Sequence, residues 1–544
     1  MTAAPLSPDP ARGRTAVRRW TAALILLCLV VLLVLFRHIE VTLPYPYHAD
    51  EGFISGPASN VLVKGELRPR RFNYPSLPSY IAAGAMAVGF LRGASHLEIR
   101  DVNQIGDVGY PHYDTPRIMQ TARQAFALLS VICIGLTGLS AWIAFRRPAA
   151  ILLAPVILLA SPLYFRHSWL YLNVDIVGTG FVMMTVAACL AGISRPSIAR
   201  MAILPGILAG LAAGSKYTLA ISILPVLVTI ALYMPRPRMV SAWVAAVAAM
   251  IVAFLAAVPY SVIDIPGFLN GVGYEVFHYA SGHAGNAGEP GWPQLLYYLQ
   301  HFVTELGYGA SILALGGLVL FWFLDWRRAL VVSILPLGLL WLLTGQRVHF
   351  TRNALPIQPF LAMFAAYGVI AVHAWAVRTA SVRGWAAKRV NVPVLAGVIL
   401  VVAAVPFWRF ADHVRDRTDS RNQLHAWIGD NLPPNWSIVV PRELGLDRRG
   451  LDARGRHVKV VELKPARDGG DIAALLSDVP APAVMLVPRW GADRRTPGQS
   501  TADALNALST QWRVIRTFGS NDVLVNYLFA TAWGDPAFSV AIVR

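Results

Sequence analysis

The sequence predicts a polytopic α-helical membrane protein with about eleven transmembrane helices, followed by a small extracytoplasmic α/β domain at the C-terminus. Hydrophobic residues make up 56% of the 544 residues and charged residues only 14%, whereas an average soluble protein has about 25% charged residues. The chain also contains repeated apolar runs of about 17–25 residues, the length that crosses a bilayer as a helix. The last part of the chain is polar and alternates β-like with helical stretches.

The predicted spans lie in the first three quarters of the chain. In order, they are Trp20–Phe36, Ile118–Phe145, Ala149–Phe165, Val174–Ile193, Met201–Gly214, Tyr217–Met234, Val240–Val258, Ala310–Leu324, Leu330–Leu343, Ala354–Trp375 and Val392–Phe407. The first run lacks a small-residue cleavage site, which favours an uncleaved helix over a signal peptide. Ser76–Leu91 is apolar but short, and it predicts an interfacial or re-entrant helix.

The net charge of +17 would indicate nucleic acid in a soluble protein. With the N-terminus in the cytoplasm, however, every second junction between spans carries a basic pair, such as Arg146-Arg147 or Arg327-Arg328. Cytoplasmic loops of membrane proteins are enriched in Lys and Arg in this way. The excess charge is therefore an orientation signal, and no nucleic-acid partner is expected.

This orientation gives the domain organisation. Residues 1–19 are a cytoplasmic tail, residues 20–408 form the membrane domain, and residues 409–544 form the extracytoplasmic domain. Two long segments of the membrane domain, 37–117 and 259–309, lie on the outer side. In the C-terminal domain we expect strands at Ser437–Val440, Val458–Leu463, Ala483–Val487, Trp512–Thr517 and Ser539–Val543, with helices near Ser420–Asn431, Asp471–Ser477 and Thr501–Leu508.

Several motifs are missing from the sequence. It contains no G-x-G-x-x-G, Walker or G-x-S-x-G pattern, and the histidines of the 259–309 segment lack the spacing of a metalloenzyme motif. Cys28, Cys133 and Cys189 each lie in an apolar run and predict small core residues, so no disulfide or zinc framework is implied.

Acidic residues mark two places on the outer side. Asp50 and Glu51 follow a Pro- and Tyr-rich segment; they fit a general base with its partner, a metal-ligand pair, or a solvated turn. Asp175 lies at the outer end of a span, where an acid is costly unless it faces a cavity. The alternative for Asp175 is a carboxylate that stabilises a helix N-terminus.

Basic residues also occur on the outer side, where the orientation rule disfavours them. They are Lys64, Arg71, Arg123, Lys216, Arg347 and Arg352. A bound anion such as a lipid phosphate would account for them. The alternatives are contacts with lipid headgroups, extension of Arg123 to the interface, and pairing with the outer acids Glu275, Glu289 and Glu305.

These residues occur in an ordered set of motifs. The set is His48-Ala-Asp50-Glu51-Gly52, then Lys64-Gly65 and Tyr74-Pro75-Ser76-Leu77, Arg123, Ser161-Pro162 with Arg166-His167-Ser168 and Asp175, Gly210-Leu-Ala-Ala-Gly-Ser-Lys216-Tyr217, and Arg352-Asn353-Ala-Leu-Pro-Ile-Gln-Pro359. In this order the sequence resembles the GT-C-fold glycosyltransferases that use polyprenyl-phosphate sugars, a family including protein O-mannosyltransferases and the aminoarabinose transferase of lipid A. It departs from the family at Asn73-Tyr74-Pro75-Ser76-Leu77, where relatives often carry Lys-Pro-Pro-Leu, and at Arg352-Asn353, where Arg-Tyr is common.

The resemblance implies a membrane glycosyltransferase that moves a sugar from a polyprenyl-phosphate carrier to an acceptor hydroxyl, with inversion, at the outer face of a bacterial-type plasma (inner) membrane. Asp50 is the implied general base, and Glu51 orients it or the acceptor. The implied phosphate- and substrate-binding residues are Lys216, Arg123, Arg352, Arg347, Arg71, Lys64, Asp175 and Tyr74. A divalent metal held by Asp50 and Asp175 is a further implication, because some members of the family use one.

The implied partners are the lipid-linked donor, a protein, glycan or lipid acceptor, and membrane lipids. Two interpretations from other classes remain open. One is a transporter or flippase for a lipid-linked or anionic substrate, although no internal symmetry of the kind common in transporters is evident. The other is a non-catalytic scaffold that displays the outer domain.

Overall fold

The computed structural model describes most of the chain up to Val382 and parts of the remainder. The described residues are 10–40, 43–45, 47–48, 50–69, 71–105, 116–283, 286–382, 419–441, 444, 446, 451–452, 455–461, 476–488, 512–518, 525–526, 531–532 and 538–543. The chain divides into two compact units. The first unit comprises Met1–His38, Glu66–Gly84 and Arg123–Arg415, and the second comprises Ile39–Gly65, Ala85–Ala122 and Asp416–Arg544.

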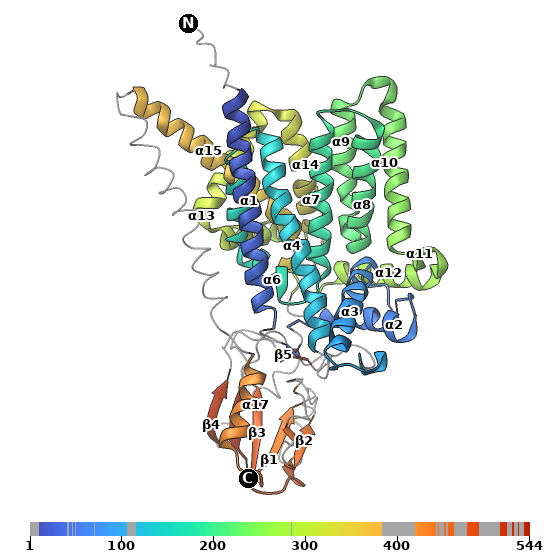
Figure 1. Cartoon of the computed structure of the whole chain (residues 1–544), viewed down its shortest axis with the longest axis vertical. Helices are drawn as coiled ribbons and strands as arrows, with labels where there is room; N and C mark the ends of the chain where they lie inside the picture. The colour runs from blue at the N-terminus through green and yellow to red at the C-terminus, as the bar shows by residue number, and fades with distance from the viewer. Residues whose placement is uncertain are drawn as a thin grey trace. The chain divides into compact units, whose positions relative to one another are not determined.

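Mostly apolar helices of different lengths make up most of the first unit (Figure 1). They are α1 (Pro10–His38), α4 (Pro116–Phe145, which begins in the second unit), α5 (Ala150–Leu159), α6 (Pro162–Trp169), α7 (Val174–Gly192), α8 (Leu204–Ser215), α9 (Ile223–Tyr233), α10 (Arg236–Ala257), α13 (Trp292–Leu324), α14 (Trp326–Thr344) and α15 (Gln358–Val382). Short turns of other helix types adjoin some of them: η2 (Ala199–Ile203), η3 (Tyr217–Ser222) and η4 (Thr351–Ile357).

Within the described residues, seven helices are long and apolar enough to cross a membrane. The pair α5 and α6, bent by 79°, adds an eighth if it is counted as one broken span. Two predicted spans, Met201–Gly214 and Tyr217–Met234, are helical but shorter than a full crossing. The predicted span Val392–Phe407 lies outside the described residues. The polytopic helical fold is thus confirmed, whereas the number of eleven spans is not.

Small residues bring neighbouring helices of this unit into close contact. A Cβ atom on Gly210 of α8 would lie 2.3 Å from the Met250 carbonyl oxygen of α10. One on Gly317 of α13 would lie 2.0 Å from the Phe364 carbonyl oxygen of α15. Helix association in a bilayer depends on such close packing, because lipid tails are as apolar as the side chains.

The predicted outer segment 259–309 is largely helical. It contains α11 (Tyr260–Ile263), α12 (Ile265–Ser281) and the first half of α13, which breaks at Gly307, where φ is +79°. Figure 1 shows α12 running across the end of α8 and α10. The predicted helix at Ser76–Leu91 is α3 (Leu77–Ser95), which is not among the candidate spans.

Polar contacts hold α12 to the chain segment 66–75. Asp264, whose Oδ1 accepts the Gly267 N–H at 3.2 Å, begins the helix, and Arg68 Nη2 donates to its other oxygen at 2.6 Å. Further along the helix, Asn73 donates to Glu275 at 2.7 Å. The hydrogen bond from Arg68, with that from Gly267, lowers the pKa of Asp264. These contacts fix the start and the middle of α12.

The second unit combines α2 (Glu51–Lys64), η1 (Val102–Ile105) and a C-terminal α/β domain that begins with α17 (Ser420–Asn431). Its five-stranded sheet has the order β2-β1-β3-β7-β4, from strands β1 (Ser437–Pro441), β2 (Val458–Val461), β3 (Ala483–Pro488), β4 (Arg513–Phe518) and β7 (Phe538–Ile542). β1 is parallel to β2 and β3, and β7 is antiparallel to β3 and β4. A separate pair is formed by β5 (Val525–Asn526) and β6 (Thr531–Ala532).

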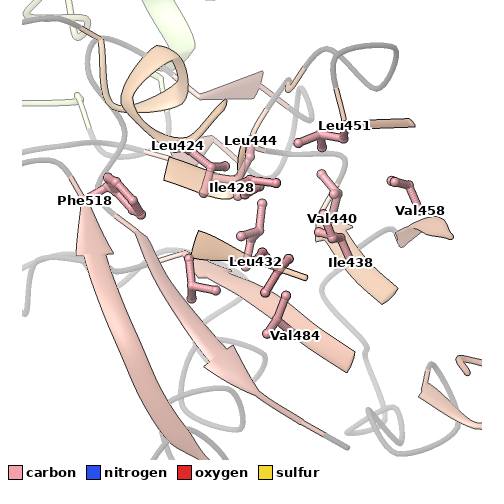
Figure 2. Packing of buried hydrophobic residues seen from close by; sticks show 12 residues of the cluster. Leu424, Ile428, Leu432, Ile438, Val440, Leu444, Leu451, Val458, Val484 and Phe518 are labelled. Carbon is pink, nitrogen blue, oxygen red and sulfur yellow. The ribbon is translucent and has the colours of Figure 1, made fainter. Parts of the chain in front are cut away.

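Leu424 and Ile428 of α17 pack on this sheet among Ile438, Val440 and Val484 (Figure 2). Helix α17 and the five strands of this sheet coincide, within a few residues, with elements predicted from the sequence. The predicted helix at Thr501–Leu508 and most of that at Asp471–Ser477 lie outside the described residues.

Candidate functional site

Asp175 is the centre of a buried polar cluster in the first unit. It lies in the first turn of α7, whose N-cap residue Asn173 accepts the Ile176 N–H at 2.8 Å. Its side chain is only 1% exposed. A carboxylate buried this deeply is strongly destabilising unless charges and hydrogen bonds compensate it.

Lys216 supplies one of these charges. It follows the last residue of α8 in an extended conformation and is 8% exposed. Its Nζ donates to Asp175 Oδ1 at 2.5 Å and to Asn353 Oδ1 at 2.7 Å. Because the backbone leaves the helix at this residue, its side chain lies between α7 and η4.

Arg352 and Asn353 enter the cluster from η4. Arg352 Nε lies 3.8 Å from Asp175 Oδ2, and its guanidinium lies over the Phe350 ring at 4.3 Å. Asn353 Oδ1 also accepts from the Tyr279 hydroxyl at 3.5 Å. One carboxylate thus faces two cations that come from segments far apart in the sequence.

The orientation of the Asn353 amide follows from its partner. A lysine ammonium has only hydrogen-bond donors, so the amide oxygen must face Lys216 and the amide nitrogen must point away from it. Among the described residues, Asn353 Nδ2 and the Tyr298 hydroxyl are buried without a hydrogen-bond partner. Both are able to donate to a ligand oxygen, and an unmade buried hydrogen bond costs about 1–3 kcal/mol.

The cluster does not fit a metal site. Both oxygens of Asp175 face cations, Lys216 at one and Arg352 at the other, and a divalent cation there would meet two positive charges. The described part of the chain also contains no group of three or more His, Cys, Asp and Glu side chains placed to hold a metal ion. We therefore assign no metal role to Asp175.

Asp50 belongs to the second unit, at the N-cap of α2. Its side chain makes no capping hydrogen bond and is 16% exposed. The His48 ring accepts the Asp50 N–H through Nδ1 at 3.1 Å, and the same nitrogen lies 3.8 Å from Asp50 Oδ2.

Glu51, in contrast, points into the protein. It is 1% exposed, and its Oε2 accepts the Tyr47 N–H at 3.3 Å. The Glu51 N–H in turn donates to the His48 carbonyl at 3.1 Å. The contacts of Glu51 therefore close the turn that carries Asp50.

The other predicted residues differ in their surroundings. Arg123 is buried in α4, so it does not extend to the surface as the snorkelling alternative required. Arg347 is exposed and lies 3.6 Å from Glu289, as the ion-pairing alternative expected. Lys64 and Arg71 are exposed, and Tyr74 is half-buried. Of the predicted cations, the structure joins Lys216 and Arg352 to Asp175.

Two members of the cluster were not predicted as site residues. Asn353 was noted only as a departure from the Arg-Tyr pattern, although its position beside Arg352 was a usable signal. Tyr279 lies in α12 among other aromatic residues, and nothing in the sequence distinguishes it from them.

Comparison with known proteins gives a structural match but no sequence match. No protein-family model and no curated protein matches the chain. The structure resembles ArnT from Cupriavidus metallidurans bound to undecaprenyl phosphate, with 16% identity over 96% of this chain and 98% of that chain, at a TM-score of 0.53. The apo state of the same protein matches over the same shares with 14% identity and a TM-score of 0.53. An oligosaccharyltransferase from Archaeoglobus fulgidus is more distant, with 11% identity, coverage of 86% and 69%, and a TM-score of 0.47.

The chain has a GT-C fold. The similarity to ArnT extends over almost the full length of both chains, so it includes the helical unit and the C-terminal domain. It confirms the fold class expected from the ordered motifs, and the seven apolar helices of the described residues agree with an integral membrane protein. At 16% identity the likeness concerns the GT-C fold and leaves the roles of individual residues to be argued from their chemistry.

Proposed function

We propose that the chain is a membrane glycosyltransferase that moves a sugar from a polyprenyl-phosphate carrier to an acceptor hydroxyl at the outer face of the membrane. The observation that carries the proposal is the buried cluster of Asp175, Lys216, Arg352 and Asn353 in a chain with the fold of ArnT. The ArnT structure that it resembles holds undecaprenyl phosphate. Donors in a buried cluster suit an anionic lipid headgroup of this kind.

The chemistry requires such donors at the leaving group. A sugar linked to polyprenyl phosphate is a phosphodiester with one negative charge. When the bond between the anomeric carbon and the phosphate oxygen breaks, its electron pair stays on that oxygen and the carrier gains a second charge. Lys216 and Arg352 stabilise this charge, because fixed cations in a dry site act more strongly than solvent does.

Asn353 adds neutral hydrogen-bond donors beside the cations. Its Nδ2, buried without a partner among the described residues, donates to a phosphate oxygen. Asp175 holds Lys216 in place and keeps the two cations together when no anion is bound.

Asp50 accepts the proton of the attacking hydroxyl. The oxygen of the acceptor forms a bond to the anomeric carbon from the face opposite the phosphate, so the reaction inverts that centre. A base must be ionised before it accepts a proton. Glu51 supports the turn from inside. Arg123, Arg71, Lys64 and Tyr74 remain predictions as substrate- or phosphate-binding residues, whereas Arg347 lies beside Glu289 at the surface.

The test is a transfer assay with purified protein in detergent. A panel of polyprenyl-phosphate sugars is supplied with cell-envelope acceptors, and the release of polyprenyl phosphate is followed, since every donor yields this product. We expect turnover with at least one donor and a loss of at least about 100-fold in Asp50→Asn, typical of removing a general base.

Asp430→Asn is the matched control, because Asp430 is exposed on α17. If Asp50→Asn retains full turnover and folds normally, Asp50 is not the base. Transport or scrambling of the lipid-linked sugar by protein-containing liposomes, without release of polyprenyl phosphate, would contradict the transferase and support a transporter.

A further inference from the structure

The loop that carries Asp50 is tied to the C-terminal domain within the second unit. Asn422 of α17 donates to the Leu43 carbonyl at 3.0 Å, and the Tyr45 hydroxyl shares a hydrogen bond of 2.7 Å with His425 Nε2. These contacts join residues 379 and 380 positions apart in the sequence. Leu43 and Tyr45 lie only a few residues before Asp50.

The Tyr45 side chain is enclosed by this contact. It is 1% exposed, its ring lies nearly parallel to that of His425, and the Arg421 guanidinium lies over it at 4.3 Å. A cation over an aromatic face is attracted to it, most strongly where water is excluded. The hydrogen bond of the buried Tyr45 hydroxyl adds to this stabilisation.

Arg421 is itself held rigidly. Its Nε and Nη2 donate to the two oxygens of Asp419 at 2.9 and 2.7 Å, and Asp419 Oδ1 also accepts the Arg421 N–H at 2.9 Å. This geometry caps the first turn of α17 and fixes the guanidinium at the same time. The Arg421 guanidinium over the Tyr45 ring therefore has little freedom to move.

An adjoining stripe of α17 is anchored in the sheet domain. Leu424 and Ile428 lie in the hydrophobic core drawn in Figure 2, and they form a stripe next to that of Arg421 and His425 on the helix. The helix thus links the core of the domain to Tyr45. A displacement of α17 would move Tyr45 with it.

The segment between Tyr45 and α2 is short and internally bonded. Glu51 Oε2 accepts the Tyr47 N–H, and His48 Nδ1 accepts the Asp50 N–H. The Phe53 N–H donates to the Asp50 carbonyl at 3.0 Å. These hydrogen bonds make the turn compact, and Tyr45 connects its N-terminal side to His425 of α17.

We propose that Arg421 and His425 of α17 are positioning residues for Asp50, acting through Tyr45. The C-terminal domain then takes part in the reaction by fixing the base, in addition to any role in holding the acceptor. The inference rests on the proposed function. The exact position of Asp50 matters, because a shift of about 1 Å at a reacting group costs on the order of 100-fold in rate.

The experiment is a double-mutant cycle on Tyr45→Phe and His425→Leu. It is run in the full-length protein with whichever polyprenyl-phosphate sugar of the panel gives turnover. Each single variant removes the shared hydrogen bond and keeps most of the packing. We expect each to lower kcat by about 10-fold or more while the KM for the donor changes by less than about 2-fold. The double variant should be no slower than the worse single variant, because both act through one bond.

Two further variants separate positioning from simple stability. His425→Gln retains a nitrogen donor and should recover part of kcat, whereas Asp430→Ala, on an exposed part of α17, should match the wild type. The melting temperature of each purified variant is measured alongside. A loss that appears only as less folded protein or only in KM assigns the contact to stability or binding and overturns the proposal.

The failure of this proposal is distinguishable from that of the proposed function. If Tyr45→Phe and His425→Leu keep the wild-type kcat while Asp50→Asn is inactive, Asp50 remains the base and positioning by α17 is wrong. If no donor of the panel is turned over by the wild type, the transferase itself is refuted, and with it the inference.

Discussion

Replacing Lys216 by methionine removes the ammonium from the cluster and keeps a side chain of similar length. Lys216 makes two short hydrogen bonds to buried partners, Asp175 and Asn353. Removing one partner of a buried ion pair costs about 3–5 kcal/mol, because the remaining charge is left uncompensated. Arg352 still lies 3.8 Å from Asp175, so we expect the lower end of this range for Lys216→Met.

The effect on catalysis should be separate and at least as large. Loss of one fixed donor at a developing negative charge lowers kcat by about 10²- to 10³-fold, or roughly 3–4 kcal/mol. We therefore expect Lys216→Met to lose both stability and turnover. The assay pairs release of polyprenyl phosphate with thermal unfolding of the purified protein in detergent.

The double variant Asp175→Asn/Lys216→Met separates the two effects. It removes both charges of the closest pair, and such a neutral replacement is often tolerated without loss of stability. The melting temperature should return towards that of the wild type, whereas kcat should stay low. If turnover returns together with stability, or if Lys216→Met keeps kcat within about 2-fold of the wild type, Lys216 does not stabilise the leaving phosphate.

Three further predictions concern contacts outside the cluster. Arg347→Ala should change kcat by less than about 2-fold, since exposed ion pairs such as that with Glu289 contribute about 0–1 kcal/mol; a loss comparable with that of Lys216→Met would place Arg347 in the site. The hydrogen bond from Arg68 lowers the pKa of Asp264 in the folded protein. The ionised carboxylate therefore stabilises the fold at any pH above about 4, the pKa of an unfolded Asp. This stabilisation is lost as the pH falls through the lower pKa of the folded state. The difference in melting temperature between wild type and Asp264→Asn should thus shrink on acidification, and a constant difference would contradict this reasoning. Gly317→Val should destabilise the helix pair by about 1–3 kcal/mol through overpacking, whereas an unchanged melting temperature would show that the helices separate freely there.

The fold could be predicted from sequence because its signals are local. An apolar run such as Val174–Ile193 indicates a span by its length, and α7 covers almost the same residues. The limits of this reasoning are seen at Ala149–Phe165, which contains a bend of 79° between α5 and α6. Hydropathy cannot report such a bend, because both arms are equally apolar. The predicted span Ala310–Leu324 covers only the second half of α13, which begins at Trp292. The first turns of this helix are too polar to indicate a span.

The candidate site could be predicted only in part. Asp175, Lys216 and Arg352 were identifiable because charged residues are rare and costly near apolar spans. The sequence did not reveal that Arg347 would pair with Glu289 at the surface while Arg352, five residues later, would turn inward. The backbone between them decides this: the Arg347 N–H donates to the Tyr279 carbonyl at 2.9 Å, and η4 begins at Thr351. The first of these is a tertiary contact with α12, which the sequence does not reveal.

Two buried ion clusters in the chain differ in how they form, and the difference bears on their roles. Asp419 and Arg421 are two residues apart, so they pair within the first turn of α17 and can do so before the domain is assembled. Asp175, Lys216 and Arg352 come from α7, the end of α8 and η4, and meet only after these elements have packed. Their charges lose water without a local partner to compensate, and a hydrophobic cluster of the same volume would often be as stable or more so. Stability alone therefore does not explain the second cluster, whereas binding of an anion whose charge grows during the reaction does.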